Sequence, residues 1–351
     1  MDFSFTEEQQ MIADTARDFF TENATSERTR AAMNGDGVDR ELWKAFCEEL
    51  GLGGVLVSEA DGGAGLGHVE FASIAEAAGA QVASLPMFGQ AMACSALGAG
   101  GSDAQKAEYL PQISGGEVIV ATARAAKIAV NGSRLSGKFE CVADGAIADL
   151  FILAGPDGAW LVRADADGVS VEGHTTMDQT RQLATVTLTN ANGDALPGPE
   201  AALAAANRTG FLCLAAEALG GAQACLDQTV AFSQDRVQFG RQIGSFQAYK
   251  HRLADMMVEI EQARSAVYWA ACAIDENTDD PDLAVHAAKA FCGDTFFKCA
   301  GDMIQLHGGI GFTWEHDAHL FFKRARSIQT MLMNGDWHRE QIATMILGEA
   351  A

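Results

Sequence analysis

The sequence predicts an α+β multidomain protein with an N-terminal helical domain, a small middle β-barrel or β-sandwich and a C-terminal four-helix bundle. Apolar residues recur at helical spacing before residue 117 and again after residue 196. Between these two parts, short β-rich runs alternate with turn dipeptides. We therefore expect domains at 1–116, 117–196 and 197–351, and a chain of 351 residues is long enough for at least two.

The first part is expected to be helical throughout. Thr6 and Gln9 form a capping-box pattern in front of an apolar helical stripe that ends at Phe20. Further helices are expected at about 38–50, 69–79, 83–98 and 102–113. The glycine-rich segment 61–67 is interpreted as a connection between helices rather than a phosphate loop. No Lys-Ser/Thr pair follows it and no strand clearly precedes it.

The middle part carries the signals of short strands. Runs of β-forming residues occur at 118–122, 150–153, 159–162, 169–171 and 184–188. They are separated by dipeptides typical of hairpins and tight turns, namely Asn131-Gly132, Asp157-Gly158, Asp167-Gly168 and Asn192-Gly193. The last part returns to helices, expected at about 199–235, 246–276, 282–307, 316–333 and 337–349. Several long helices in succession predict a bundle.

Charge and cysteine spacing exclude several classes of protein. The chain has 47 acidic and 24 basic residues and a net charge of −23, which would repel nucleic acids and anionic lipids. We see no apolar run of about 18 residues, as a membrane span needs, and no secretory signal, so a cytoplasmic location is expected. No CxxC pair occurs, and His316 and His319 lack a third ligand, so no metal site is expected.

Two motifs in the last part carry chemistry. In the segment DRVQFGRQIGSFQ (235–247), Arg236 is a fixed cation, Phe239 offers an aromatic face, and Gln247 offers an amide. In QLHGGIGFTWE (305–315), Gln305 precedes the pair Gly308 and Gly309, which allows a ligand to approach the backbone closely. Both motifs therefore carry groups that can bind a ligand.

These two segments resemble the FAD-binding signature and the second signature of the acyl-CoA dehydrogenase family. The resemblance implies that Arg236 pairs with the pyrophosphate of FAD and that Gln247 reaches an adenine or ribose edge. The N-terminal pattern and the segment 59–67 fit as well, so the resemblance covers nearly the whole chain. It implies an FAD flavoprotein with the acyl-CoA dehydrogenase-like fold that dehydrogenates an acyl-CoA thioester between its α and β carbons. It also implies an oligomer, because the second signature binds the FAD of the neighbouring subunit. The family usually passes its electrons to an electron-transfer flavoprotein.

The base of this family is missing from its usual positions. Most members carry a Glu followed by Gly-Thr after the second signature, where this chain has Asn334, Gly335 and Asp336. An amide cannot take the proton. Asp336 matches the Thr that usually faces the cofactor, and so it is a candidate cofactor contact. Some members place the base on the first long C-terminal helix, where the matching residue is Gly210.

The substrate positions of the family also differ. The resemblance assigns substrate binding to Arg208, Gly210 and Phe211, with Arg208 and Phe211 at the family's acyl-side Asp and Arg positions. Small residues at Gly210, Ala215 and Ala216 could widen an acyl pocket for a bulky or ring-bearing acid. In the middle domain the segment 121–129 lacks the family's Thr-Glu-Pro…Gly-Ser-Asp stretch, so the wall against the flavin is expected to be remodelled.

Three explanations of the missing base stay open. We favour one subunit of a heteromeric acyl-CoA dehydrogenase, such as a heterotetramer with a homologous chain that supplies the base, as in the degradation of steroid side chains and other lipids. The second is a homomeric enzyme of β-oxidation type with a relocated base, either Asp336 or Glu217. The third is a non-catalytic scaffold subunit. Outside these, a flavin-free interaction protein is disfavoured by the retained motifs, and an acyl-CoA oxidase by the chain length.

Overall fold

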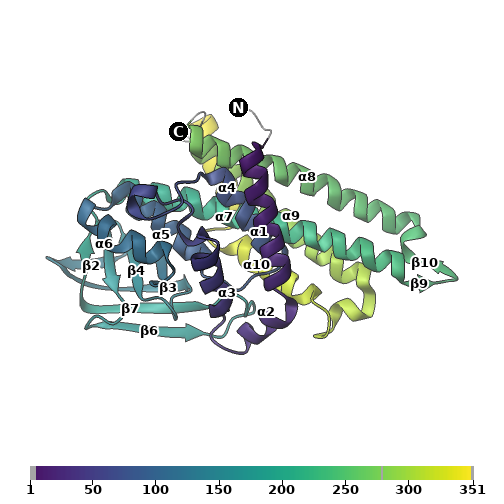
Figure 1. Cartoon of the computed structure of the whole chain (residues 1–351), viewed down its shortest axis with the longest axis horizontal. Helices are drawn as coiled ribbons and strands as arrows, with labels where there is room; N and C mark the ends of the chain where they lie inside the picture. Colours follow the sequence, from purple (N-terminus) through teal and green to yellow (C-terminus); the bar gives the residue numbers. More distant parts are fainter. Residues whose placement is uncertain (1–4, 278–279, 349–351) are drawn as a thin grey trace. The chain divides into compact units, whose positions relative to one another are not determined.

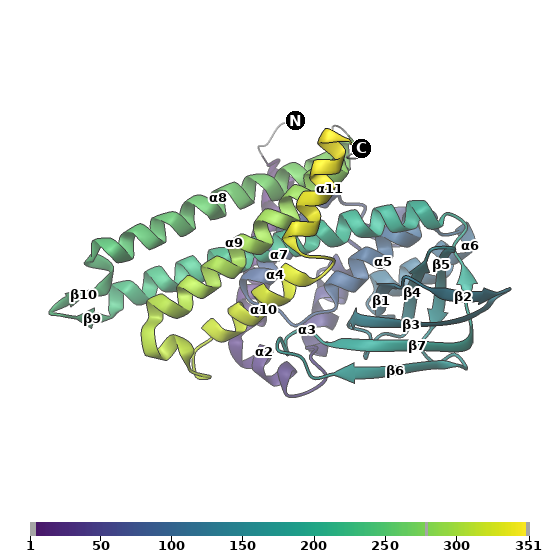
Figure 2. The same ribbon diagram turned by 180° about the vertical axis from the view of Figure 1, so that it is seen from behind.

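The computed structural model describes residues 5–277 and 280–348. Helices, then β-sheets, then a helical bundle follow one another along the chain, which confirms the predicted fold class (Figures 1 and 2). Contacts sort the chain into two compact units. The bundle unit comprises Met1–Glu27, His68–Ala83 and Phe211–Ala351, and the sheet unit comprises Arg28–Gly67 and Ser84–Gly210. The boundaries at 116 and 196 stay a prediction.

The bundle unit is built from the long C-terminal helices and two N-terminal ones. Its helices are α1 (Glu7–Asn23), α4 (His68–Ala80), the part of α7 (Pro199–Asp235) from Phe211 onward, α8 (Gln247–Glu276), α9 (Pro281–His307), α10 (Ala318–Thr330) and α11 (Gly335–Leu347). Helix α9 packs against α8, α10 and α11, and α4 packs against α1 and α8. The packing between α4 and α7 is close, since a Cβ added at Gly220 would lie 1.8 Å from the Glu76 carbonyl oxygen.

Side-chain caps, two local and one from another helix, mark where these helices begin. The capping box of Thr6 and Gln9 is present at the start of α1, as predicted. Asp280 caps α9, with Pro281 at the first helical position. The start of α4 is capped by a carboxylate from α8, because Asp275 accepts the backbone N–H groups of His68 and Val69 at 2.8 and 3.1 Å. This helix end already holds an anionic group, which agrees with a connection rather than a phosphate loop at 61–67.

The sheet unit holds two four-stranded sheets. One has the order β1-β4-β5-β8 and the other β2-β3-β7-β6, and only the β1–β4 pair is parallel. The strands are β1 (Val120–Arg124), β2 (Ile128–Asn131), β3 (Arg134–Ala143), β4 (Leu150–Gly155), β5 (Gly158–Arg163), β6 (Val169–His174), β7 (Leu183–Asn192) and β8 (Asp194–Ala195). Phe139, Phe151 and Trp160 lie in one apolar core to which both sheets contribute side chains, so the two sheets form a sandwich.

Helices of the sheet unit show where the sequence was misleading. They are α2 (Ser26–Met33), α3 (Arg40–Lys44), α5 (Met87–Gly100) and α6 (Asp103–Ser114). The expected helix at 38–50 is interrupted, because α3 changes to a π-helical turn at Ala45–Glu49. The helix expected from 83 begins only at Met87, after Pro86, since a residue before proline disfavours the helical conformation. Helix α2 was not predicted, and strands β2, β3 and β8 were marked only by the neighbouring turn dipeptides Asn131-Gly132 and Asn192-Gly193.

Helix α7 corrects the expectation about apolar runs. Among the described residues it is the one helix with the length and apolar composition of a membrane span, although no such run was recognised in the sequence. The apolar window is 94% buried inside the fold. We therefore assign this hydrophobicity to the packing of a core helix.

Candidate active site

The first cofactor motif forms a hairpin after α7. Strands β9 (Val237–Gln238) and β10 (Arg241–Gln242) pair antiparallel. Phe239 and Gly240 make the turn with φ values of 54° and 76°, and two successive left-handed residues are the signature of a type I′ hairpin turn. The turn projects the ring of Phe239, which is 90% exposed. The hairpin thus presents an aromatic face.

The second motif begins at the end of α9. Gly308 ends this helix with a left-handed φ of 65°. A Cβ added at Gly308 or Gly309 would meet no atom within 4 Å, so the backbone is open on that side. Gln305 is exposed one turn earlier on α9, and Phe312, which follows the glycines, is 87% exposed.

The fold brings these two motifs together within the bundle unit. Near the end of α7, the ring of Phe232 stacks on His307 with the ring centroids 4.4 Å apart. At the start of α8, the hydroxyl of Tyr249 donates to the Leu306 carbonyl at 3.2 Å. The end of α9 therefore contacts the helices on both sides of the hairpin, at the same end of the bundle in Figure 1.

The residues of this end fit a dinucleotide. The Arg236 guanidinium is exposed, and no described residue forms an ion pair or hydrogen bond with it. Gln247, the first residue of α8, is exposed as well. An accessible cation, open glycines and uncovered aromatic rings match the pyrophosphate, ribose and ring portions of such a ligand. Their role in cofactor binding stays a prediction, in which Gln305, Gly308 and Gly309 meet the FAD of the neighbouring subunit.

Asp336, the remaining predicted cofactor contact, lies elsewhere in the bundle unit. Its carboxylate is 89% exposed and accepts from Arg339 at 3.1 Å. Arg339 also pairs with Asp294 in the middle of α9. Asp294 lies 12 residues before Leu306 on that helix, about 18 Å at a rise of about 1.5 Å per residue. The chain by itself does not bring Asp336 to the two motifs.

The usual base position serves a structural purpose. Asn334 is the N-cap of α11, and its Oδ1 accepts the Trp337 backbone N–H at 3.0 Å. Gly210, at the other base position, is buried. Arg208 is half-buried, and Phe211 is buried against the imidazoles of His286 and His338 at centroid distances of 5.0 and 4.8 Å. The substrate role of Arg208, Gly210 and Phe211 stays a prediction.

Glu217, the other candidate base, lies in the core of the bundle unit. Its side chain is 5% exposed and that of Arg324 is 3% exposed, and the carboxylate and guanidinium are 3.4 Å apart. Removing one partner of such a buried pair would leave an uncompensated charge. This arrangement favours the interpretation of Glu217 as a structural residue.

A buried titratable cluster escaped the sequence analysis. Lys289 and His286 lie one turn apart on α9 and His338 lies on α11, all less than 8% exposed. The two imidazole Nδ1 atoms are 2.7 Å apart. Burial and the neighbouring Lys289 and His286 lower the pKa of His338 to about 3, and burial lowers the pKa of Lys289 to about 8. The sequence signal that could have revealed this cluster is Lys289, a charged residue on an apolar stripe of the helix expected at 282–307.

Comparison with known proteins decides the family. The profile of the acyl-CoA dehydrogenase N-terminal domain matches residues 6–117, and that of the C-terminal domain matches residues 203–347. The chain belongs to the acyl-CoA dehydrogenase family. This confirms the resemblance inferred from the two signatures, and with it an oxidoreductase of a flavoprotein family.

Individual acyl-CoA dehydrogenases are similar over nearly the whole chain. The acyl-CoA dehydrogenase IpdE2 of Mycolicibacterium smegmatis is 34% identical, with 93% of this chain and 95% of that protein covered. The solved structure titled Tcur3481–Tcur3483 steroid ACAD is 31% identical, with a TM-score of 0.88 and coverage of 97% and 98%. The ChsE4–ChsE5 complex from Mycobacterium tuberculosis is 26% identical, with a TM-score of 0.92 and complete coverage of both chains.

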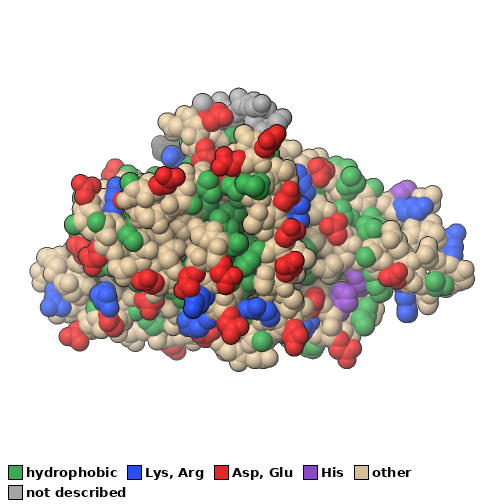
Figure 3. Space-filling view, in the orientation of Figure 1, with side chains coloured by type: hydrophobic (Ala, Val, Ile, Leu, Met, Phe, Trp, Pro, Cys, Tyr) green, Lys and Arg blue, Asp and Glu red, His purple; other side chains and the backbone are tan. Residues whose placement is uncertain are grey.

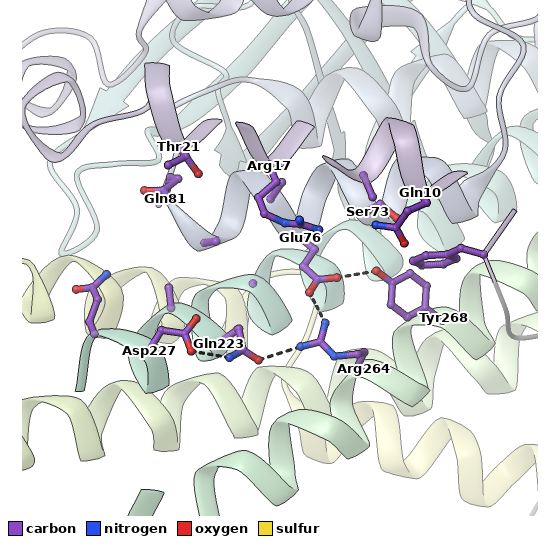
Figure 4. A pocket seen from close by; sticks show the side chains of 17 residues that line it. Gln10, Arg17, Thr21, Ser73, Glu76, Gln81, Gln223, Asp227, Arg264 and Tyr268 are labelled. Atoms are coloured by element: carbon purple, nitrogen blue, oxygen red, sulfur yellow. Dashed lines mark hydrogen bonds and ion pairs between the residues drawn. The ribbon is translucent and has the colours of Figure 1, made fainter. Parts of the chain in front are cut away.

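This acyl-CoA dehydrogenase also has a polar pocket of about 480 Å³ between α1, α4, α7 and α8 (Figure 4). Glu76 points into it and accepts from Arg264 at 2.5 Å and from Tyr268 at 2.7 Å. Arg264 also donates to Gln223 at 2.9 Å, and Gln223 donates to Asp227 at 2.9 Å. Glu76, Arg264, Tyr268, Gln223 and Asp227 thus form one hydrogen-bonded network that links α4, α7 and α8.

The surface of the protein is acidic, and two histidines outside the cluster contact other rings. Acidic side chains are spread over the face drawn in Figure 3, in keeping with the net charge of −23. His316 lies against His307 with the ring centroids 4.5 Å apart, whereas His319 lies against Trp314 at 4.6 Å. No group of three metal-ligating side chains occurs within residues 5–277 and 280–348.

Proposed function

We propose that this chain is one subunit of a heteromeric, FAD-dependent acyl-CoA dehydrogenase that acts on a bulky acyl-CoA thioester. In this reaction a base takes the α proton, the β hydrogen leaves as hydride, and the bond between the two carbons becomes double. Bound FAD supplies the acceptor of the hydride. We further propose that a homologous second chain supplies the base and that an electron-transfer flavoprotein reoxidises the enzyme. We also propose that the enzyme acts in the cytoplasm.

The proposal depends most on Asn334, which stands at the base position without a basic group. This residue occupies the family's usual base position, cannot accept a proton and is engaged as the cap of α11. Gly210 at the alternative position has no functional group. An enzyme of this family needs a carboxylate at the α carbon, so the missing group is sought in a second chain.

Two relatives support a partner and a bulky substrate. The Tcur3481–Tcur3483 and ChsE4–ChsE5 structures are each named as a pair of different proteins, and the first is named a steroid ACAD. In this chain Ala215 and Ala216 on α7 are at most 1% exposed, and Gly210 precedes them on the same helix. Small buried side chains on this helix are consistent with a wide acyl pocket.

The residues at the end of the bundle would hold the cofactor. Arg236 would pair with the pyrophosphate, Phe239 would cover an aromatic ring, and Gln247 would hydrogen-bond an adenine or ribose edge. Gln305 and Gly308–Gly309 would approach the FAD of the neighbouring subunit through the open backbone. Because residues of two subunits would contact each FAD, the complete site would form only in the oligomer.

The alternatives with a base in this chain are weaker on physical grounds. Glu217 is buried beside Arg324, and Asp336 is exposed and paired with Arg339. A homomeric enzyme would have to free one of these carboxylates from its guanidinium. A non-catalytic scaffold remains the alternative if the partner binds all of the FAD.

Native mass spectrometry of the tagged chain purified from its own host tests the proposal. We expect a complex with a second, homologous chain and fewer than one FAD per subunit. A homo-oligomer with one FAD per chain would contradict it and would direct mutagenesis to Asp336→Asn and Glu217→Gln. As a matched pair, Arg236→Gln should lower the FAD content, whereas Arg17→Gln, at an exposed arginine that pairs with Asp14, should not.

A further inference from the structure

The connection between α10 and α11 has an unusual backbone. Leu332 and Met333 both have left-handed φ values, 47° and 77°, although neither is a glycine. They come directly before Asn334, which occupies the family's base position. Side chains that rarely adopt this conformation need an external constraint to hold it.

Lys289 supplies part of that constraint. Its Nζ, on the buried side of α9, donates to the Met333 carbonyl at 2.6 Å and to the Gln329 carbonyl at 3.1 Å. Gln329 lies in the last turn of α10, whose carbonyls lack intrahelical partners, so the ammonium caps this helix as well. One buried lysine thus binds the segment on both sides of Leu332.

The histidine pair holds the carbonyl between those two. His338 Nε2 lies 3.1 Å from the Leu332 carbonyl, which can only accept, so this nitrogen carries a proton. Burial disfavours a second proton, and His338 Nδ1 is therefore an acceptor. His286 Nδ1, 2.7 Å away, must then be the donor. The two rings form a directed chain from His286 through His338 to Leu332.

We propose that His286, Lys289 and His338 are positioning residues that fix the backbone of residues 331–334 for the reaction. Phe211, which the family resemblance assigns to substrate binding, packs on both imidazoles. We call His286, Lys289 and His338 the backbone clamp. The clamp lies between Phe211, a candidate substrate residue, and residues 331–334, which include the base position. The inference rests on family membership and on the position of Asn334, and it concerns the shape of this segment rather than proton transfer, which Asn334 cannot perform.

Paired variants of the two histidines test the clamp in the purified complex. His338→Gln keeps a donor for the Leu332 carbonyl and His286→Asn keeps a donor for His338 Nδ1, whereas His338→Leu and His286→Leu remove them. The readouts are amide hydrogen exchange of residues 331–338 by mass spectrometry, and kcat and KM for the acyl-CoA substrate. Selective ¹⁵N-histidine NMR of the wild-type chain reports the two tautomers.

For the Leu variants we expect exchange in 331–338 to rise at least tenfold and kcat to fall about tenfold, with KM within twofold of wild type. The Gln and Asn variants should recover most of both, and NMR should show His338 protonated on Nε2 and His286 on Nδ1. Lys298→Met is the control, because Lys298 lies on α9 in an exposed pair with Glu259. Unchanged exchange or unchanged kcat in the Leu variants, or the opposite tautomers, would overturn the proposal. Hydrogen exchange and the histidine tautomers are properties of this chain's own fold, so a homo-oligomer would contradict the proposed function without changing these two outcomes.

Discussion

At the scale of single residues, Asn334 illustrates how a catalytic position is converted into a structural one. Its amide accepts the N–H of Trp337 and so satisfies one of the free donors at the start of α11. Asn334→Ala should lower the free energy of unfolding by about 1 kcal/mol, because the cap is lost. Asn334→Asp should keep the cap and the stability. Urea denaturation of the three proteins measures this, and equal midpoints would contradict the assignment.

The buried His338 predicts a dependence of stability on pH. Its pKa is lowered to about 3 from 6.5, so between these values the unfolded chain binds a proton that the folded chain does not. Stability should therefore fall as the pH drops below about 6.5, by up to about 1.4 kcal/mol per pH unit for one such group. Burial lowers the pKa of His286 as well, with the same sign.

Urea midpoints at pH 7.5, 6.0 and 5.0 measure this slope. His338→Gln removes the titrating group while retaining a donor for the Leu332 carbonyl, so the slope should become shallower. An identical slope in the variant would show that His338 is not the group responsible.

At the scale of elements, the contact between α4 and α7 depends on Gly220. An added Cβ would lie 1.8 Å from the Glu76 carbonyl oxygen and 2.9 Å from the Ala80 nitrogen, both of them backbone atoms. Gly220→Ala should therefore lower stability by about 2 kcal/mol or more, because two helices must separate. Gly98→Ala on α5, where no atom lies within 4 Å, should instead be neutral or stabilise by up to about 1 kcal/mol. Thermal unfolding compares the two, and a stable Gly220→Ala would refute this explanation.

At the scale of the whole molecule, the two motifs expose aromatic rings that this chain's own fold leaves uncovered. Phe239 is 90% exposed and Phe312 is 87% exposed. We expect Phe239→Ser and Phe312→Ser to change the unfolding free energy of the isolated chain by less than about 0.5 kcal/mol. They should nevertheless weaken retention of FAD and of the partner chain at least tenfold. The control is Met11→Ser, at an exposed apolar residue of α1.

Native mass spectrometry with FAD quantification gives both readouts. If the two Phe→Ser variants retained cofactor and partner as the wild type does, the exposed rings would need another explanation.

Much of the architecture was predictable because its signals are local. The capping residues Thr6 and Asp280, the turn glycines and the helical spacing of the bundle depend on neighbours a few residues away. Strand β3 was missed because its sequence lacks clear alternation and its pairing with β7 shifts register between Phe139 and Val142. The start of α5 was placed four residues early because the apolar pattern continues through Pro86.

The candidate site likewise combines features that the sequence determines with features that only the fold determines. From the sequence alone, the two signatures determined the family, and the residues themselves show that Asn334 and Gly210 carry no base, because chemical identity needs no coordinates. Only the tertiary structure decided that His307 of the second signature packs on Phe232, just before the first signature, and that Lys289 and His338 bind the 331–334 backbone. The physical reason is distance along the chain: His286 and His338 are separated by 52 residues. No local pattern specifies that their nitrogens meet, and packing of α9 against α11 alone brings them into contact.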